Sequence, residues 1–195
     1  GPIANWIEES LLQNTALGVM CAVGTAFPRT VRPLNRFATR AYGDREFTDR
    51  SYEVFTSPRR VRFREMEYAL PRPAIPQALR DISGLIERQG WDIGFPIEVR
   101  VAAPDENWMS TAYRREVGYI AVHQYYRRDH LPYFRAVDAL LRSYDGRPHW
   151  GKIHFLDAAE LAGRYPRFGD FVALRHRLDP DRVFANAYLD RVLGS

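Results

Sequence analysis

Two opposite charges occur two positions apart in residues 94–103, a segment in which apolar residues recur at every second position. Glu98 and Arg100 fall between these apolar residues. Side chains alternate between the two faces of a β-strand, so a strand here would place Glu98 and Arg100 on one face. The pair can form a solvent-facing salt bridge, or it can bind a polar ligand jointly. The spacing leaves both interpretations open.

Residues 117–126 show a second alternating pattern, which is typical of another strand. The pattern places Tyr119, His123 and Tyr125 on a single face. If that face adjoins the face that carries Glu98, the two strands would form a site rich in hydrogen-bonding groups.

Residues 149–154 concentrate further reactive side chains. This segment holds His149 and His154, two of the five histidines, and Lys152 is the single lysine among 28 basic residues. The glycine at position 151 permits close approach of the backbone to a ligand. Lys152 can stabilise negative charge that develops on an intermediate, as fixed cations do in many active sites. A metal site of His149, His154 and His123 is the alternative, but no recognised metal motif fits, and we expect no metal.

Hydrophobic periodicity predicts the elements that would position these residues. Strands are predicted over residues 60–70, 94–103 and 117–126, with a short strand within 147–154. Helices are predicted over residues 5–14, 16–26, 33–41, 74–89, 132–144, 158–164 and 168–178. This order predicts an α+β fold in which helices flank a largely antiparallel sheet. We expect residues 1–59 to form a helical segment and residues 60–195 to form an α+β domain.

Composition argues against several classes of protein. With 46% hydrophobic residues, the 195-residue chain can bury a core and is not disordered. Its 28 basic residues are interspersed with 24 acidic ones, which favours a solvated surface over a nucleic-acid interface. The sequence contains no glycine-rich phosphate loop, no Gly-x-Ser-x-Gly segment and only one cysteine, Cys21, in an apolar segment. No apolar run is long enough to span a bilayer, so we expect a cytoplasmic protein, with loose membrane association left open.

Several separated motifs, in order along the chain, resemble one known family. They are Arg-Glu-Met-Glu-Tyr at 64–68, Pro-Ile-Glu-Val-Arg at 96–100, residues 105–110, Arg-Pro-His-Trp-Gly-Lys-Ile-His at 147–154, Tyr-Pro-Arg-Phe at 165–168, Leu-Asp-Pro-Asp at 178–181 and Phe-Ala-Asn-Ala-Tyr-Leu at 184–189. Together they are similar to the C-terminal part of the aldonolactone oxidoreductases. These are sugar-1,4-lactone oxidases and dehydrogenases of the vanillyl-alcohol-oxidase flavoprotein superfamily, here most similar to actinobacterial forms.

The resemblance implies a cofactor and a reaction. In that family an N-terminal domain binds FAD and a C-terminal cap domain shapes the substrate pocket. We therefore expect the FAD-binding domain to lie outside this chain, which begins Gly1-Pro2 without a methionine. The implied reaction oxidises a secondary alcohol next to the lactone carbonyl, with hydride transfer to flavin N5 and proton transfer to a base. The implied partners are the FAD-binding portion, a small sugar lactone and an electron acceptor (oxygen, a cytochrome or a dye), but no nucleic acid.

The resemblance also implies roles for single residues. The expected catalytic residues are Lys152, Glu98 and Arg100. The residues expected to bind the substrate are His123, His149 and Trp150. The residues expected to contact the cofactor are Lys152 and Asn186. Two alternatives stay open: a FAD-dependent alditol oxidase that acts on an open-chain polyol, and a non-catalytic cap or binding module.

Overall fold

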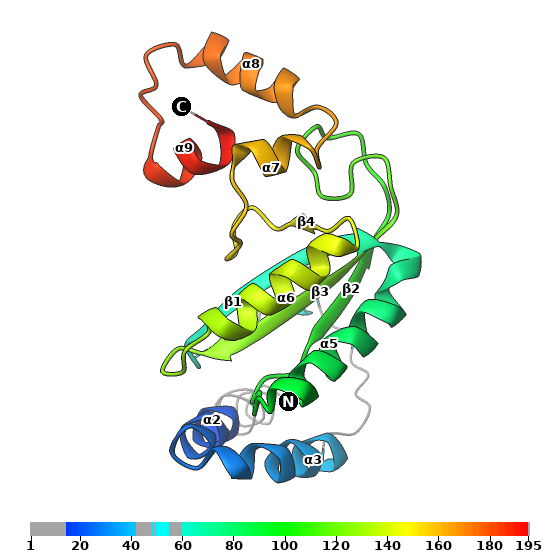
Figure 1. Ribbon diagram of the computed structural model, residues 1–195, viewed down its shortest axis with the longest axis vertical. Helices are drawn as coiled ribbons and strands as arrows, with labels where there is room; N and C mark the ends of the chain where they lie inside the picture. Colours follow the sequence, from blue (N-terminus) through cyan, green and yellow to red (C-terminus); the bar gives the residue numbers. More distant parts are fainter. Residues whose placement is uncertain (1–14, 42–47, 49, 55–59, 195) are drawn as a thin grey trace. The chain divides into compact units, whose positions relative to one another are not determined.

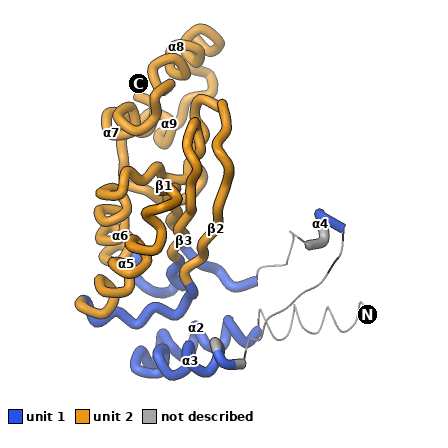
Figure 2. The backbone as a smooth tube through the Cα atoms, turned by 90° about the vertical axis from the view of Figure 1, so that its right-hand side faces the viewer, with its two compact units in different colours: residues 1–64, 89–96, 123–130 blue, residues 65–88, 97–122, 131–195 orange. Residues whose placement is uncertain are grey.

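A computed structural model describes residues 15–41, 48, 50–54 and 60–194 of the chain. The chain divides into two compact units, which Figure 2 shows in different colours. The larger unit consists of residues 65–88, 97–122 and 131–195. The smaller unit consists of residues 1–64, 89–96 and 123–130.

A sheet lies mainly in the larger unit, and within the described residues it has four strands in the order β2-β3-β1-β4. The strands are β1 (Phe63–Pro71), β2 (Glu98–Ala102), β3 (Val117–Tyr125) and β4 (Arg147–Pro148). The pairs β2–β3 and β1–β4 are antiparallel. β1 and β3 are antiparallel as well, because Arg72 N–H donates to Glu116 O beyond one end and Tyr126 N–H donates to Arg62 O beyond the other.

Helices α5 (Ile75–Gln89) and α6 (Leu131–Ser143) cover one face of the sheet (Figure 1). The core contains side chains that are fully buried: Met66, Tyr68, Leu70, Ala78, Ile82, Ile120, Val122, Phe134, Val137 and Leu141. A glycine lets α5 approach β3 closely, since a Cβ atom on Gly118 would lie 2.3 Å from Cγ1 of Ile75. The alternation along β1 therefore places Met66, Tyr68 and Leu70 on the helix-covered face and Glu65 and Glu67 on the other.

Three helices follow β4: α7 (Ala158–Ala162), α8 (Phe168–Leu178) and α9 (Ala187–Leu193). α7 begins with a capping box, in which the side chains of Asp157 and Glu160 each accept a hydrogen bond from the other residue's backbone N–H. Arg147 of β4 is buried, and its guanidinium donates to the carbonyls of Arg164 at 2.9 Å and Tyr113 at 3.1 Å. These contacts anchor the start of the segment that carries Lys152.

The smaller unit contains α2 (Ala16–Ala26), the 3-10 turn η2 (Pro28–Thr30), α3 (Val31–Ala41) and α4 (Ser51–Val54). The Asn35 amide donates to Ile93 O at 2.9 Å, which joins α3 to residues 89–96. Burial raises the pKa of Cys21 to about 11, so its thiol stays protonated at neutral pH. None of the described helices is both long and apolar enough to cross a membrane.

The predicted α+β class, with a largely antiparallel sheet and a helical N-terminal region, is confirmed. β2 occupies only Glu98–Ala102 of the predicted segment 94–103, since Pro96 has no N–H to donate to a ladder. β4 occupies only Arg147–Pro148, because the chain turns at residues 149–152. The helix predicted over residues 5–14 lies outside the described residues. The boundary between residues 59 and 60 stays a prediction.

Candidate functional site

The sheet face opposite α5 and α6 carries polar side chains from β1, β2 and β3. In the β2–β3 register Arg100 lies directly opposite Tyr119. The guanidinium carbon of Arg100 lies 5.2 Å from the centre of the Tyr119 ring, a cation–π contact. A hydrogen bond of 2.8 Å joins the hydroxyls of Tyr119 and Thr111 and restrains the ring. The sequence left open whether the strand face with Tyr119 adjoins the strand face with Glu98 and Arg100. For Tyr119 it does.

Residues 149–153 run beside β1 and bring Lys152 to this face. His149 N–H donates to Glu67 O at 3.0 Å, and Ile153 N–H donates to Glu65 O at 3.0 Å. Between these two bonds the backbone makes a turn, closed by a hydrogen bond of 3.1 Å from Lys152 N–H to His149 O. Because Glu65 and Glu67 share one face of β1, the turn brings the Lys152 side chain to both carboxylates.

Five charged side chains form an ion-pair network in which the sign of the charge alternates: Glu65, Lys152, Glu67, Arg100 and Glu98. Lys152 Nζ donates to Glu65 Oε1 at 2.5 Å and to Glu67 Oε2 at 2.6 Å. Arg100 Nη2 donates to Glu67 Oε1 at 2.5 Å, and Arg100 Nε lies 3.3 Å from Glu98 Oε1. Since β3 lies between β2 and β1, the Arg100 side chain reaches across Tyr119 to Glu67.

Exposure changes from the centre of the ion-pair network to its end on β2. The Glu67 side chain at the centre is 0% exposed and that of Lys152 is 18% exposed. The side chains of Arg100 and Glu98 are 49% and 40% exposed. The network therefore has a buried anchor and an accessible end.

The charges of the ion-pair network support one another. Burial alone would raise the pKa of Glu67, but hydrogen bonds from Arg100 and Lys152, together with their charges, lower it overall. The hydrogen bond with Glu67 in turn raises the pKa of Arg100. The Glu67–Arg100 pair is therefore ionised at neutral pH, although its carboxylate has no contact with solvent.

His149 lies next to the ion-pair network and is half-buried. Gly151 N–H donates to His149 Nδ1 at 3.0 Å, so the proton of the neutral ring is on Nε2. Burial lowers the pKa of His149, and the charges of Lys152 and Arg100 also lower it, against an opposing effect of nearby carboxylates. At neutral pH His149 is therefore a neutral side chain with a hydrogen-bond donor at Nε2.

Trp150 and Asn186, two other residues expected in the site, make structural contacts. Trp150 Nε1–H donates to Met109 O at 2.9 Å, and its ring centre lies 5.1 Å from that of Tyr165. Asn186 is the N-cap of α9, and its side-chain oxygen accepts from Leu189 N–H at 3.0 Å. Their roles in binding the substrate and the cofactor stay predictions.

His123 lies near the end of β3, in the smaller unit. Its side chain is 6% exposed. The His123 ring packs edge-on against Phe63 with ring centres 5.3 Å apart, and it stacks on Phe95 at 6.0 Å. Aromatic packing of this kind contributes to the burial of the imidazole. Its role in substrate binding stays a prediction.

Glu65 and Glu67 were not identified as site residues from the sequence, although the alternating pattern of residues 60–70 places both on one strand face. The opposite face of β1 presents Met66, Tyr68 and Leu70, which are all fully buried. Two carboxylates on the other face of such a strand indicate cationic partners, because an ionised carboxylate is rarely buried without one. The alternation cannot name those partners, and Lys152 lies 85 residues beyond Glu67.

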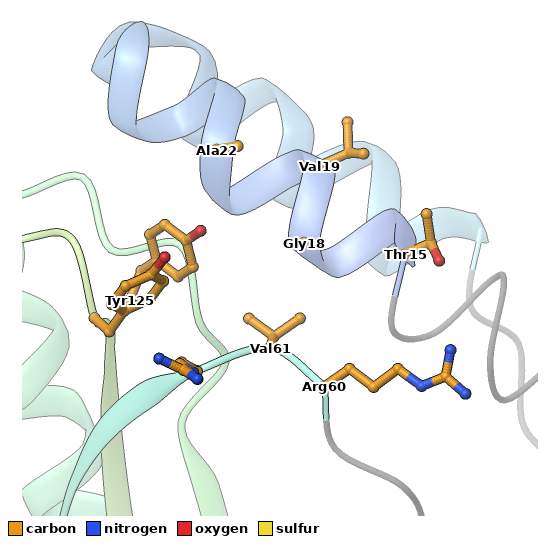
Figure 3. Close-up of a pocket in the computed structure, with 9 residues that line it drawn as sticks. Thr15, Gly18, Val19, Ala22, Arg60, Val61 and Tyr125 are labelled. Carbon is orange, nitrogen blue, oxygen red and sulfur yellow. The ribbon is translucent and has the colours of Figure 1, made fainter.

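A separate pocket of about 470 Å³ lies in the smaller unit (Figure 3). It is bordered by α2, by residues 60–62 and by Tyr125 and Tyr126. Figure 3 shows Arg60 directed away from Tyr125. The described lining residues include no carboxylate, histidine or cysteine, and the only hydroxyl groups among them are those of Thr15, Tyr125 and Tyr126. The ion-pair network is the better candidate for a reaction site.

Comparison with known proteins identifies relatives that are similar in sequence, two of them over nearly the whole chain. The L-gulono-1,4-lactone dehydrogenase of Mycobacterium tuberculosis is 49% identical over 182 residues, which are 93% of this chain and 42% of the relative. The L-gulonolactone oxidase of Bos taurus is 30% identical over 196 residues, covering 97% of this chain and 44% of the relative. An alditol oxidase of Streptomyces is 36% identical over 132 residues, covering 66% of this chain and 31% of the relative.

The chain thus spans less than half the length of these curated relatives. A family model, that of D-arabinono-1,4-lactone oxidase, matches residues 2–192 and so includes every member of the ion-pair network. By this match the chain belongs to the D-arabinono-1,4-lactone oxidase family.

Proposed function

We propose that the full-length protein containing this chain is a FAD-dependent sugar-1,4-lactone oxidoreductase, and that this chain forms its substrate-binding cap. Membership of the D-arabinono-1,4-lactone oxidase family supports the lactone substrate class. The ion-pair network is the observation that carries the proposal, because it joins Lys152, Arg100 and Glu98 on one sheet face. These are the three residues for which the sequence resemblance implies a catalytic role.

The cations of the network fit a flavin as a partner. When bound, FAD supplies the acceptor for the hydride that leaves the alcohol carbon. Arg100 and Lys152 present a guanidinium and an ammonium group that are held by carboxylates of the same sheet face. Fixed cations of this kind stabilise negative charge as it develops, without rearrangement of the site. We assign both residues to this electrostatic role.

Glu98 is the carboxylate of the network best suited to face a substrate hydroxyl. Its side chain is 40% exposed, whereas that of Glu67 is fully buried and that of Glu65 is 21% exposed. Its partner Arg100 lies 3.3 Å from Oε1, so the carboxylate is held in place while its side chain stays accessible to a hydroxyl group. Glu98 would orient that hydroxyl and take its proton as the hydride leaves. The Nε2–H of neutral His149 would donate to a further substrate oxygen.

Replacement of Lys152 tests the proposed function. In the full-length protein, Lys152→Met should lower turnover of L-gulono-1,4-lactone with a dye acceptor by about a hundredfold or more, while the visible absorbance of bound flavin is retained. Arg142→Met is a matched control, because Arg142 is a cation of the same unit that pairs with Asp138 and Glu160 rather than with the network. Unchanged turnover in Lys152→Met would remove the assignment.

An open-chain polyol is a second candidate substrate, favoured by the similarity of residues in this chain to an alditol oxidase. Such a substrate offers alcohol groups for oxidation but has no ring carbonyl. Comparison of kcat/KM for L-gulono-1,4-lactone and for sorbitol separates the two classes. We expect the lactone to be preferred, and a higher kcat/KM for sorbitol would reassign the substrate.

A further inference from the structure

The carboxylate of Glu67 is the only member of the ion-pair network that contacts both cations. One oxygen accepts from Arg100 at 2.5 Å and the other from Lys152 at 2.6 Å. We infer that Glu67 is a positioning residue, which holds the ammonium of Lys152 and the guanidinium of Arg100 in the geometry that the oxidation requires. This inference rests on the proposed function, because it concerns the same two cations.

Glu67 cannot act by touching the substrate. Its side chain is 0% exposed, and its two oxygens are already engaged by the two cations. Its effect must pass through Lys152 and Arg100. This distinguishes Glu67 from Glu98 at the accessible end of the network, whose side chain is 40% exposed.

Glu67 also holds the backbone of the turn that carries Lys152. Its carbonyl accepts from His149 N–H at 3.0 Å, three residues before Lys152. Glu67 therefore restrains the turn that carries Lys152 through its carbonyl, and the tip of the Lys152 side chain through its carboxylate. A lysine side chain has four rotatable bonds and would otherwise lose much conformational freedom when it meets a ligand.

The outer carboxylates cannot replace Glu67. Glu65 contacts Lys152, and Glu98 contacts Arg100, but neither contact joins the two cations. Glu65 and Glu98 hold each cation separately, whereas Glu67 sets the separation between them. A displacement of about 1 Å in such a group can reduce turnover by roughly a hundredfold. We therefore expect loss of the Glu67 charge to reduce turnover even though Lys152 and Arg100 are still present.

The test uses the full-length flavin-loaded protein and a double-mutant cycle. Glu67→Gln should lower kcat for L-gulono-1,4-lactone by roughly tenfold to a hundredfold, with bound flavin retained. In a Lys152→Met background, Glu67→Gln should lower kcat by at most about a third of the factor by which it lowers kcat in the parent protein. The reason is that the effects of residues that act as a unit are not additive. Asp138→Asn is the matched control: a buried carboxylate of the same unit, 3% exposed, that contacts neither Lys152 nor Arg100.

The cycle separates a positioning role from a structural one. A purely structural Glu67 would give the same fold-loss in both backgrounds, and this result, or a kcat of Glu67→Gln within twofold of the parent protein, overturns the inference. If Lys152→Met itself leaves kcat unchanged, the proposed function fails instead. If Glu67→Gln does not fold, Glu67→Asp keeps the charge and withdraws the carboxylate by one methylene. A roughly tenfold lower kcat in Glu67→Asp supports the inference, and an unchanged kcat overturns it.

Discussion

Two buried carboxylates lie on opposite sides of the same sheet and differ in what their partners do. Glu67 of β1 holds Lys152 and Arg100 on the charged face. Asp138 of α6, on the helix-covered face, is 3% exposed; it accepts from the hydroxyl of Tyr68 and pairs with Arg142 at 3.6 Å. Since Tyr68 follows Glu67 in β1, neighbouring positions of one strand engage both groups.

The cationic partners of the two carboxylates contact different groups in turn. Arg142, the partner of Asp138, also pairs with Glu160, the residue that completes the capping box of α7. These contacts therefore join β1, α6 and α7. Arg100, the partner of Glu67, continues to Glu98, and the side chains of both are at least 40% exposed. We therefore propose that Glu67 serves a reaction site, because its partner Arg100 is 49% exposed and continues to Glu98, whereas Asp138 serves to join elements of the fold through Arg142.

The largest expected effect on stability concerns the charged face. Glu67→Ala should lower the free energy of unfolding by about 4 kcal/mol, because it removes the fully buried carboxylate shared by two cations and leaves each of them with one outer carboxylate, Glu65 or Glu98. Urea unfolding followed by circular dichroism measures the loss. The double variant Glu67→Ala with Lys152→Met should lose less than the sum of the two single variants, since it removes one charge of each sign. A loss below about 1 kcal/mol in Glu67→Ala would contradict the claim that the buried Glu67 carboxylate stabilises the fold through its two cations.

A smaller effect is expected at a buried polar pair without a counter-charge. The Tyr188 hydroxyl donates to Trp150 O at 2.5 Å, so His154 Nε2 must donate to that hydroxyl, 3.1 Å away. His154 Nδ1 is buried and has no hydrogen-bond partner among the described residues. Burial and the charge of Arg191 lower the pKa of His154 to about 4 from its ordinary value of 6.5.

The lowered pKa of His154 determines the pH range of this effect. Between pH 6.5 and about 4 the unfolded chain binds a proton at His154 that the folded chain does not bind. Stability therefore falls as the pH is lowered through this window, by up to about 3 kcal/mol. His154→Gln cannot titrate and should show a flatter dependence of unfolding free energy on pH. Equal slopes in the two proteins would refute the assignment. The contribution of Glu67, whose pKa is lowered from 4.5, is present above pH 4.5 and is lost as the pH falls below that value.

The smallest effect is expected on the helix-covered face. Asp138→Asn keeps an oxygen that can accept from Tyr68 and removes only the charge that faces Arg142. Arg142 still has Glu160, so the free energy of unfolding should fall by about 1 kcal/mol. Thermal unfolding of the variant beside Glu67→Ala measures the contrast directly. A loss in Asp138→Asn as large as that in Glu67→Ala would remove the distinction between the two carboxylates.

The strand pattern predicted part of the ion-pair network. Alternation placed Glu98 and Arg100 on one face, and the observed register sets Arg100 opposite Tyr119, as that prediction requires. The same alternation separates Glu67 from the buried Tyr68, yet Glu67 was not recognised as part of the site. Local periodicity reports which face a side chain occupies, whereas the partner on that face depends on strand order.

The sequence by itself determined the family motifs, the α+β class and the single lysine at position 152. Only the tertiary structure decided that Glu67 lies between Lys152 and Arg100, which are 85 and 33 residues away along the chain. That contact exists because β1 lies between β3 and β4 in the sheet, with the turn after β4 on one side and the reach of Arg100 across β3 on the other. Contacts over such separations are set by how the sheet is assembled, and no local pattern of residues encodes them.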